Sequence, residues 1–190
     1  MQHRFLLHDF AQRHDLDFLS DTRSDRTVHE YVYSREDNGR KVHRFAYSQS
    51  WDATRPIVLW VMLNPGTGDT EQRKRPTLER CIRWSTTWGY GGLLIGNLFS
   101  VRTKSAKELL RSLAPSDARN ELALRFLHSL AAETVIAWGD HGHQLQGVTP
   151  LLPILEGAVC LGVTGKGQPR HPLYVKGDAE RRPWAPVENK

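Results

Sequence analysis

Residues 56–69 read Pro-Ile-Val-Leu-Trp-Val-Met-Leu-Asn-Pro-Gly-Thr-Gly-Asp, an apolar run that stops abruptly at a polar turn. The apolar part, residues 57–63, is short and rich in large and β-branched side chains, which is typical of a strand buried on both faces. Asn64, Pro65 and Gly66 favour a turn, because proline fixes one backbone dihedral and glycine permits unusual ones. Ligands of open α/β sheets bind beyond the carboxyl ends of the strands, so we expect the functional site at this turn.

Three further apolar stretches predict strands that alternate with helices. The strands are expected at residues 93–99, 134–138 and 158–163, and the helices within residues 76–89, 105–113, 117–133 and 143–156. This alternation predicts an α/β fold, a three-layer α/β/α sandwich around a central four-stranded, mostly parallel sheet.

Residues 28–34 and 42–48 alternate large and polar side chains on either side of Asp37-Asn38-Gly39. Asn-Gly is a strong signal for a tight turn, so this region predicts an N-terminal β-hairpin extension. The remaining boundaries are a helical extension over residues 1–25, a single α/β domain over residues 26–176, and a loose polar tail over residues 177–190.

The composition limits the class of protein. A chain of 190 residues can bury a sizeable core as one domain. No apolar stretch approaches the roughly 20 residues of a membrane helix, and residues 1–20 lack the apolar core of a signal peptide, so we expect a cytoplasmic protein without a membrane partner. Cys81 and Cys160 are the two cysteines, too few for an iron–sulfur cluster or a four-cysteine zinc site, and we expect two buried thiols.

Polar residues stand at the end of each expected strand. Asn64 follows the first strand, Asn97 lies in the second, Asp140 follows the third, and His171 lies in the segment after the fourth. The carboxyl ends of parallel strands meet at one edge of a sheet, so these residues predict a cleft there.

The sequence around these strand ends resembles the bacterial family DUF1643, a domain of unknown function. The resemblance extends from about residue 45 to residue 175. It rests on five motifs, Met62–Thr67, Trp88–Gly92, Asn97–Phe99, Trp138–Gly142 and Pro169–Tyr174. The family name supplies no activity.

The same landmarks, in the same order, are similar to those of the uracil-DNA glycosylase superfamily. The resemblance implies that Asn64-Pro65-Gly66 is the loop after the first strand and that Asn97 reads the base. It further implies that Trp138-Gly139 closes the third strand and that His171-Pro172 begins the last motif. Leu173 would then be the wedge beside the base, although this motif usually continues with serine.

The side chains at these positions suit cleavage of an N-glycosidic bond, which builds positive charge on the sugar and negative charge on the departing base. Asn64 can orient a water, or the Asp69 carboxylate can act in its place, and positioning suffices against a cationic sugar. His171 can donate a hydrogen bond to the base. The amide of Asn97 offers a donor and an acceptor to a pyrimidine edge. The expected base-binding residues are Asn97, Pro65 and Gly66.

Basic residues on the loops beyond the strands, together with a net charge of +5, favour DNA, single or double stranded, as the partner. The expected nucleic-acid-binding residues are Arg73, Lys74, Arg75, Arg102, Lys166, Arg170 and Leu173. We expect no cofactor and no metal, because Asp140, His141 and His143 lack a further ligand motif and are typical of a capped helix start. The oligomeric state is open, and a monomer is the default.

The prediction is therefore a DNA glycosylase-like hydrolase that acts on a damaged or modified base, for example a hypermodified pyrimidine. Two alternatives are a non-catalytic nucleic-acid-binding domain and a hydrolase or transferase of free nucleosides or nucleotides. One architecture hosts many activities, so the fold does not separate them. Structural roles also remain open, for Asn64 as a turn residue, for Asn97 as a strand-end amide and for His171 as a packing residue.

Overall fold

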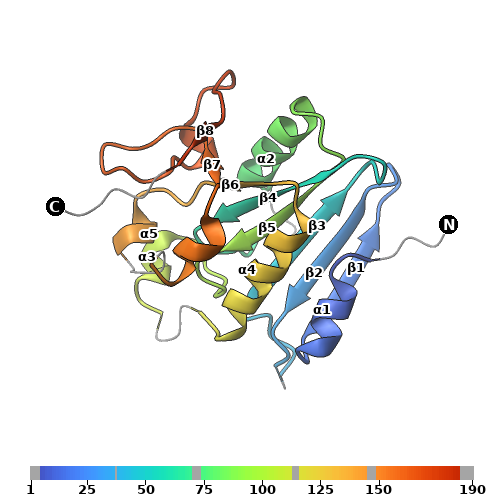
Figure 1. Cartoon of the computed structure of the whole chain (residues 1–190). Helices are drawn as coiled ribbons and strands as arrows, with labels where there is room; N and C mark the ends of the chain where they lie inside the picture. Colours follow the sequence, from blue (N-terminus) through green and yellow to red (C-terminus); the bar gives the residue numbers. More distant parts are fainter. Residues whose placement is uncertain (1–4, 37, 70–73, 113–115, 145–148, 185–190) are drawn as a thin grey trace.

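The computed structural model describes residues 5–36, 38–69, 74–112, 116–144 and 149–184. It has one eight-stranded sheet with the strand order β1-β2-β3-β5-β4-β6-β7-β8 (Figure 1). The strands are β1 (Asp17–Thr22), β2 (Val28–Tyr33), β3 (Arg44–Ser50), β4 (Ile57–Met62), β5 (Gly92–Asn97), β6 (Glu133–Ile136), β7 (Val159–Cys160) and β8 (Arg182–Pro183). The helices are α1 (His8–Arg13), α2 (Pro76–Thr87), α3 (Ala106–Leu109), α4 (Arg119–Leu130) and α5 (His141–Gln144), with 3-10 helices η1 (Thr149–Leu155) and η2 (Pro172–Tyr174).

The sheet is mixed and mostly antiparallel. Four of its seven pairings are antiparallel, and the parallel ones join β5 to β4, β4 to β6 and β6 to β7. The predicted β-hairpin is confirmed as β2 and β3, but it is no separate extension, because β3 pairs with β5 and places Tyr47 opposite Ile95. The sheet is therefore larger than the expected four strands, since this long-range pairing extends it on one side and β8 extends it on the other.

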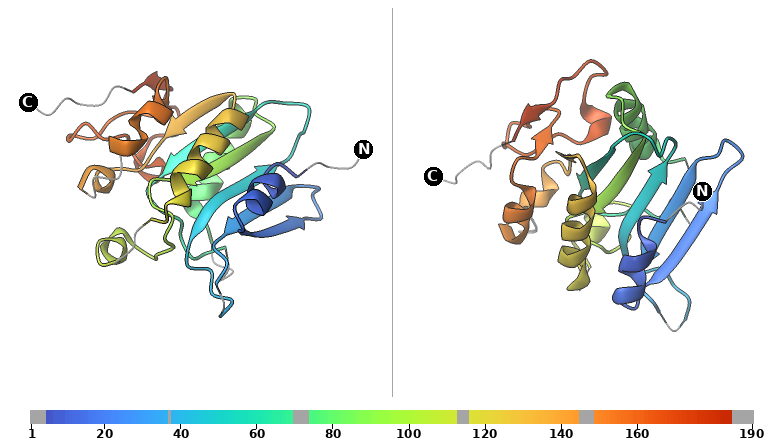
Figure 2. Two further views of the ribbon diagram at one scale, coloured as in Figure 1. Left: turned by 60° about the horizontal axis from the view of Figure 1, so that its bottom comes forward. Right: turned by 45° about the vertical axis from the view of Figure 1, so that its right-hand side comes forward.

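Both faces of the sheet are buried at its centre, around β4 and β5. On β4, Leu59 and Val61 belong to the core cluster that contains Leu124 and Leu127 of α4 and Phe10 of α1. The alternate side chains of β4 pack with α2 in a second cluster, whose indole rings Trp60, Trp84 and Trp88 are stacked. Helices α1 and α4 lie over the same face (Figure 2). The continuous apolar run of β4 follows from this burial on two sides.

A glycine allows α4 to approach the centre of the sheet. A Cβ atom on Gly96 would lie 2.5 Å from Leu124 and 3.2 Å from Leu127, closer than ordinary contact. In the first turn of α4, Asn120 donates hydrogen bonds to the carbonyl oxygens of Asn97 and Leu98, at 3.0 and 3.1 Å. These bonds fix the end of β5, which later forms part of the site.

Both ends of the chain contain strands that were not predicted. The helical extension expected over residues 1–25 holds α1, but residues 17–22 form the edge strand β1. In the expected loose tail, β8 pairs with β7, and Trp184 packs edge-on against Trp138 with ring centroids 5.4 Å apart. Residues 185–190 lie outside the described part of the chain.

The helix expected within residues 143–156 is replaced in its described part by α5 and the 3-10 helix η1. Pro153 lies inside η1, and proline lacks the backbone N–H that an α-helix needs, which disfavours an α-helix over this segment. Cys81 and Cys160 are buried free thiols, as expected. Within the described residues, no helix has the length and apolar character required to cross a bilayer.

Candidate functional site

A cleft of about 900 Å³ lies where β4, β5 and β6 end. Pairing in register places these strand ends at the same level, because Met62 on β4 is opposite Asn97 on β5 and Val61 is opposite Ile136 on β6. The backbone N–H groups of Leu98 and Ala137 extend the pairing onto β4 by donating to Met62 and Val61, at 2.9 and 2.8 Å. The segment before η2 completes the cleft.

The structure brings most of the predicted site residues to this cleft. Its lining includes Asn64, Gly66, Asp69, Lys74, Arg75, Asn97, Arg170 and His171. Among the other described candidates, the lining does not include Pro65, Arg102, Lys166 and Leu173. Arg73 lies outside the described residues. Most of the residues predicted at strand ends therefore lie at the cleft, whereas the chemical role of each residue stays a prediction.

Asn97 carries the most unusual environment in the cleft. The residue is 1% exposed, and neither Oδ1 nor Nδ2 has a hydrogen-bond partner among the described residues. Burying an unpaired polar group costs about 1–3 kcal/mol, and most buried amides avoid this cost. An amide that offers one acceptor and two donors inside a cleft fits the edge of a planar polar ligand.

Asn64 is held in one orientation at the end of β4. Its Nδ2 atom donates to Thr103 Oγ1 at 2.9 Å and to the carbonyl oxygen of Pro65 at 3.1 Å. The Thr103 N–H donates back to the Pro65 carbonyl oxygen at 3.1 Å. No described residue donates to Asn64 Oδ1, so this oxygen is left to accept a hydrogen bond from a water or ligand.

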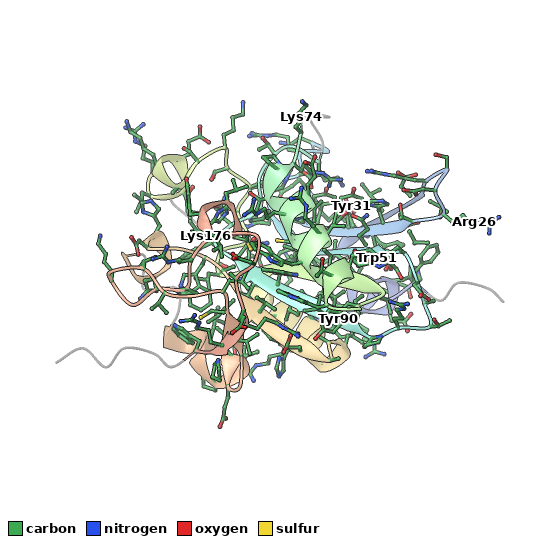
Figure 3. All side chains as sticks on the ribbon, turned by 90° about the horizontal axis from the view of Figure 1, so that it is seen from above. Arg26, Tyr31, Trp51, Lys74, Tyr90 and Lys176 are labelled. Carbon is green, nitrogen blue, oxygen red and sulfur yellow. The ribbon has the colours of Figure 1, made fainter. Side chains whose placement is uncertain are left out.

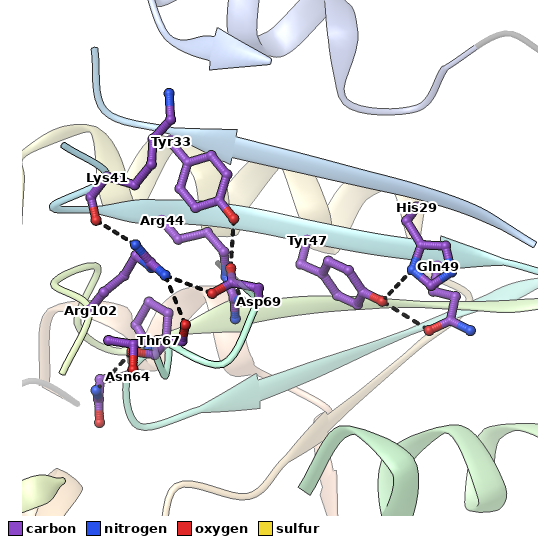
Figure 4. A network of polar contacts seen from close by, with 11 residues as sticks. His29, Tyr33, Lys41, Arg44, Tyr47, Gln49, Asn64, Thr67, Asp69 and Arg102 are labelled. Atoms are coloured by element: carbon purple, nitrogen blue, oxygen red, sulfur yellow. Dashed lines mark hydrogen bonds and ion pairs between the residues drawn. The ribbon is translucent and has the colours of Figure 1, made fainter. Parts of the chain in front are cut away.

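Asp69 is enclosed by positive charge. Its side chain is 0% exposed, and its carboxylate lies 3.0 Å from Arg44 and 2.7 Å from Arg102. The Tyr33 hydroxyl also donates to it at 2.6 Å (Figure 4). Burial by itself raises the pKa of Asp69, but Arg44, the Tyr33 hydroxyl and Arg102 outweigh burial and hold this pKa at about 2. The carboxylate therefore ties the loop after β4 to β2, β3 and the loop after β5.

This ion pair involves two residues with predicted roles, and both roles stay predictions. The Asp69 carboxylate has three described partners, Arg44, Arg102 and Tyr33, and its predicted role in activating a water stays untested. Arg102 has a side chain that is 6% exposed, and it also donates to the Lys41 carbonyl oxygen at 2.7 Å. A guanidinium buried in this way holds the loop after β5 in place, and its predicted contact to the phosphates of a nucleic acid stays untested.

His171 lies at the start of η2. Its Nδ1 accepts a hydrogen bond from the backbone N–H of Leu173 at 3.4 Å, and burial lowers its pKa. A neutral ring whose Nδ1 is an acceptor carries its proton on Nε2, which is then available as a donor. Gly139 adopts a φ of +74° and donates its N–H to the Pro169 carbonyl oxygen at 2.9 Å, which joins the end of β6 to this segment.

The lining of the cleft, as far as its residues are described, carries more basic than acidic side chains. It contains five lysine or arginine residues, Arg44, Lys74, Arg75, Lys104 and Arg170, and two aspartates, Asp69 and Asp140. Lys74 lies beside the first turn of α2 (Figure 3). This balance favours an anionic ligand.

Tyr47 forms an aromatic wall that the sequence did not reveal. Its ring lies 5.7 Å from the Arg44 guanidinium and 5.6 Å from the Arg75 guanidinium. The Tyr47 hydroxyl donates to Gln49 at 2.9 Å and lies 2.9 Å from His29 Nδ1, which fixes the ring (Figure 4). Tyr47 belongs to the predicted hairpin, and no motif in that hairpin marks it, because only the pairing of β3 with β5 brings it to the cleft.

Asp140, Thr164 and Tyr174 also line the cleft. The Thr164 hydroxyl donates to Asp140 Oδ1 at 2.5 Å. The Tyr174 ring is 78% exposed and lies 5.8 Å from the His171 ring. The sequence places Asp140 at a strand end and so at the cleft, but its neighbours His141 and His143 favoured a helix cap over a chemical role. Within the described residues, no group of three His, Cys, Asp or Glu side chains is placed to hold a metal ion.

A protein-family model described as "Protein of unknown function (DUF1643)" matches residues 44–173. The match begins at the first residue of β3, includes every strand that ends at the cleft, and reaches the segment containing His171. No curated protein and no solved structure matches the chain. These comparisons give no support for a relationship to the uracil-DNA glycosylase superfamily, which stays a prediction from the motifs.

Proposed function

We propose a function from the cleft itself, because the chain belongs to the DUF1643 family and the description of that family names no activity. The proposed function is hydrolysis of the N-glycosidic bond of a damaged or modified base in DNA. The finer fold assignment, a three-layer sandwich like that of uracil-DNA glycosylases, is part of this proposal. Strands β5, β4, β6 and β7 run parallel, with α2 on one face and α4 on the other, which agrees with it.

The observation that carries the proposal is the buried amide of Asn97, which has no hydrogen-bond partner among the described residues and lies in a cleft whose described lining is mostly basic. The structural amide of Asn120 has its nitrogen bonded to two carbonyl oxygens and only its Oδ1 without a described partner, whereas both polar atoms of Asn97 lack one. A flipped base supplies a planar edge with both donors and acceptors, which satisfies this amide. The cost of burying the amide in the free protein is then recovered on binding.

The other cleft residues supply groups that the reaction needs. Asn64 Oδ1 can accept a hydrogen bond from a water and orient it toward the anomeric carbon. The Nε2–H group of neutral His171 can donate to the oxygen on which the departing base develops negative charge, an interaction typically worth about 3 kcal/mol. Lys74, Arg75 and Arg170 can hold the flanking phosphates. The base is extruded from the stack at a cost of a few kcal/mol, which is lowest for damaged or unpaired bases.

The test uses single-stranded and duplex oligonucleotides that carry a panel of modified bases, followed by alkali to break the strand at abasic sites. We expect strand breaks with at least one base for the wild-type protein and none for Asn97→Leu. Leucine has a similar volume and no polar group, so the melting temperature of this variant should be equal to or above that of the wild type. Asn38→Leu, at an exposed turn residue, is the matched control and should keep full activity.

Each alternative function predicts its own result in this test. Tight, salt-sensitive binding of DNA without strand breaks would support the non-catalytic binding domain. Release of base from free nucleosides or nucleotides, with little affinity for DNA, would support a hydrolase or transferase of these small substrates. The absence of breaks with every base, together with unchanged binding by Asn97→Leu, would refute the proposal.

A further inference from the structure

Two carboxylates line the described part of the cleft, those of Asp69 and Asp140. The Asp69 carboxylate is ion-paired with two arginines and accepts a hydrogen bond from a tyrosine, and its side chain is fully buried. Asp140 has one described partner, the Thr164 hydroxyl, which donates to Oδ1 at 2.5 Å. In the described part of the chain, no group donates to Asp140 Oδ2. A water or substrate in the cleft can therefore engage Asp140 and not Asp69.

The surroundings of Asp140 hold it in a defined position. Gly139, the residue before it, has a φ of +74° and is bonded through its N–H to the Pro169 carbonyl oxygen. Its partner Thr164 is fixed in a tight turn, because the Thr164 N–H donates to Gln168 at 2.8 Å and the Thr164 carbonyl oxygen accepts from Gly167 at 3.0 Å. The carboxylate is thus placed by two loops that are bonded to each other, the kind of preorganisation that catalysis requires.

We propose that Asp140 is the catalytic carboxylate of the site and accepts the proton of the attacking water. This inference rests on the proposed glycosidic hydrolysis. In the step, the water oxygen forms a bond to the anomeric carbon while the bond from that carbon to the base nitrogen breaks. The electron pair of the broken bond leaves with the base, which the Nε2–H group of His171 stabilises. Asp140 takes one proton from the water and later returns it to solvent.

A structural role for Asp140 makes a different prediction. If the contact from Thr164 to Asp140 only held the two loops together, removal of the charge would lower the melting temperature and disturb binding and turnover alike. A catalytic carboxylate instead affects turnover much more than binding, because it acts on the bond-breaking step.

The experiment compares Asp140→Asn, Asp140→Glu and Asp178→Asn in the oligonucleotide assay, with the affinity for the uncleaved oligonucleotide measured separately. Asp178 is an exposed carboxylate outside the lining of the cleft, so Asp178→Asn is a matched control. We expect Asp140→Asn to lower turnover by about 100-fold or more, the typical contribution of a general base. Its affinity should stay within about threefold of the wild type and its melting temperature should not change, while Asp140→Glu should recover part of the turnover.

Turnover by Asp140→Asn equal to that of the wild type would overturn this inference and leave the proposed function intact. A parallel loss of melting temperature, affinity and turnover would also overturn it, in favour of the structural role. The absence of base release by the wild-type protein would overturn both the inference and the proposed function.

Discussion

Replacing Asp69 by asparagine should destabilise the protein in a way that depends on pH. The folded-state pKa of this carboxyl is about 2, against an ordinary value of 3.8. This difference of almost two pKa units, at about 1.4 kcal/mol per unit, gives about 2.5 kcal/mol of stability from the ionised carboxylate. Asparagine also leaves Arg44 and Arg102 without their counter-charge, and removal of one member of a buried ion pair costs about 3–5 kcal/mol.

The sign of the pH dependence follows from the lowered pKa. The stabilisation is fully present above the unfolded pKa, near 4, and is lost as the pH falls through the folded pKa, near 2. We therefore expect Asp69→Asn to be less stable than the wild type by about 3 kcal/mol at pH 7, and we expect most of this difference to vanish at pH 2. Asp117, whose pKa is also lowered to about 2, is present in both proteins, so its contribution cancels in the comparison.

The assay is urea unfolding of both proteins at pH 7, 5, 4, 3 and 2, followed by tryptophan fluorescence, with Asp178→Asn as an exposed control. If wild type and Asp69→Asn had the same free energy of unfolding at pH 7, the ion-paired Asp69 carboxylate would not stabilise the fold, and the reasoning would be refuted. A difference that persists undiminished to pH 2 would show that the carboxylate contributes by shape and hydrogen bonding, not by charge.

Three further perturbations have simple expected outcomes. Asn120→Ala removes the two bonds that hold the end of β5 and should lower the free energy of unfolding by about 1–3 kcal/mol in the same urea assay, whereas no change would contradict the role given to these bonds. Tyr174→Ala should leave the melting temperature unchanged, because this ring is 78% exposed, but should weaken binding of single-stranded DNA about tenfold, with Tyr174→Phe retaining affinity. If Tyr174→Ala and Tyr174→Phe bound single-stranded DNA with equal affinity, stacking of a base on this ring would be excluded. Arg75→Gln should reduce the salt dependence of DNA binding by about one phosphate contact, and an unchanged slope would remove Arg75 from the phosphate-binding set.

The sequence was informative where local patterns decide the structure. The apolar run before Asn64 is buried on both faces. The end of this strand, and with it the position of Asn64 at the edge of the sheet, could therefore be predicted from the local sequence pattern alone. The same reasoning placed Asn97 within a strand over residues 93–99, whereas β5 ends at Asn97. His171 was predicted from its motif. These three residues line one cleft, although they are far apart in the sequence.

The features that could not be predicted depend on long-range pairing. The edge strand β1 has mostly exposed side chains and no clear alternation, so its identity follows only from its pairing with β2. The pairing of β3 with β5 joins segments more than 40 residues apart and merges the hairpin into the main sheet. The ion pair of Asp69 likewise unites residues from three separate segments, Arg44, Asp69 and Arg102, and no spacing in the sequence marks them as partners.

The central claim is that the buried amide of Asn97 binds a nucleobase. The most direct measurement is NMR of ¹⁵N-labelled protein during titration with free pyrimidine bases, with the Asn97 side-chain NH₂ signals identified by their absence in Asn97→Leu. The account predicts that these two amide signals shift and saturate with at least one base, while the side-chain signals of the exposed Asn38 do not move. Asn97 signals that stay unshifted with every base, up to millimolar concentration, would contradict it.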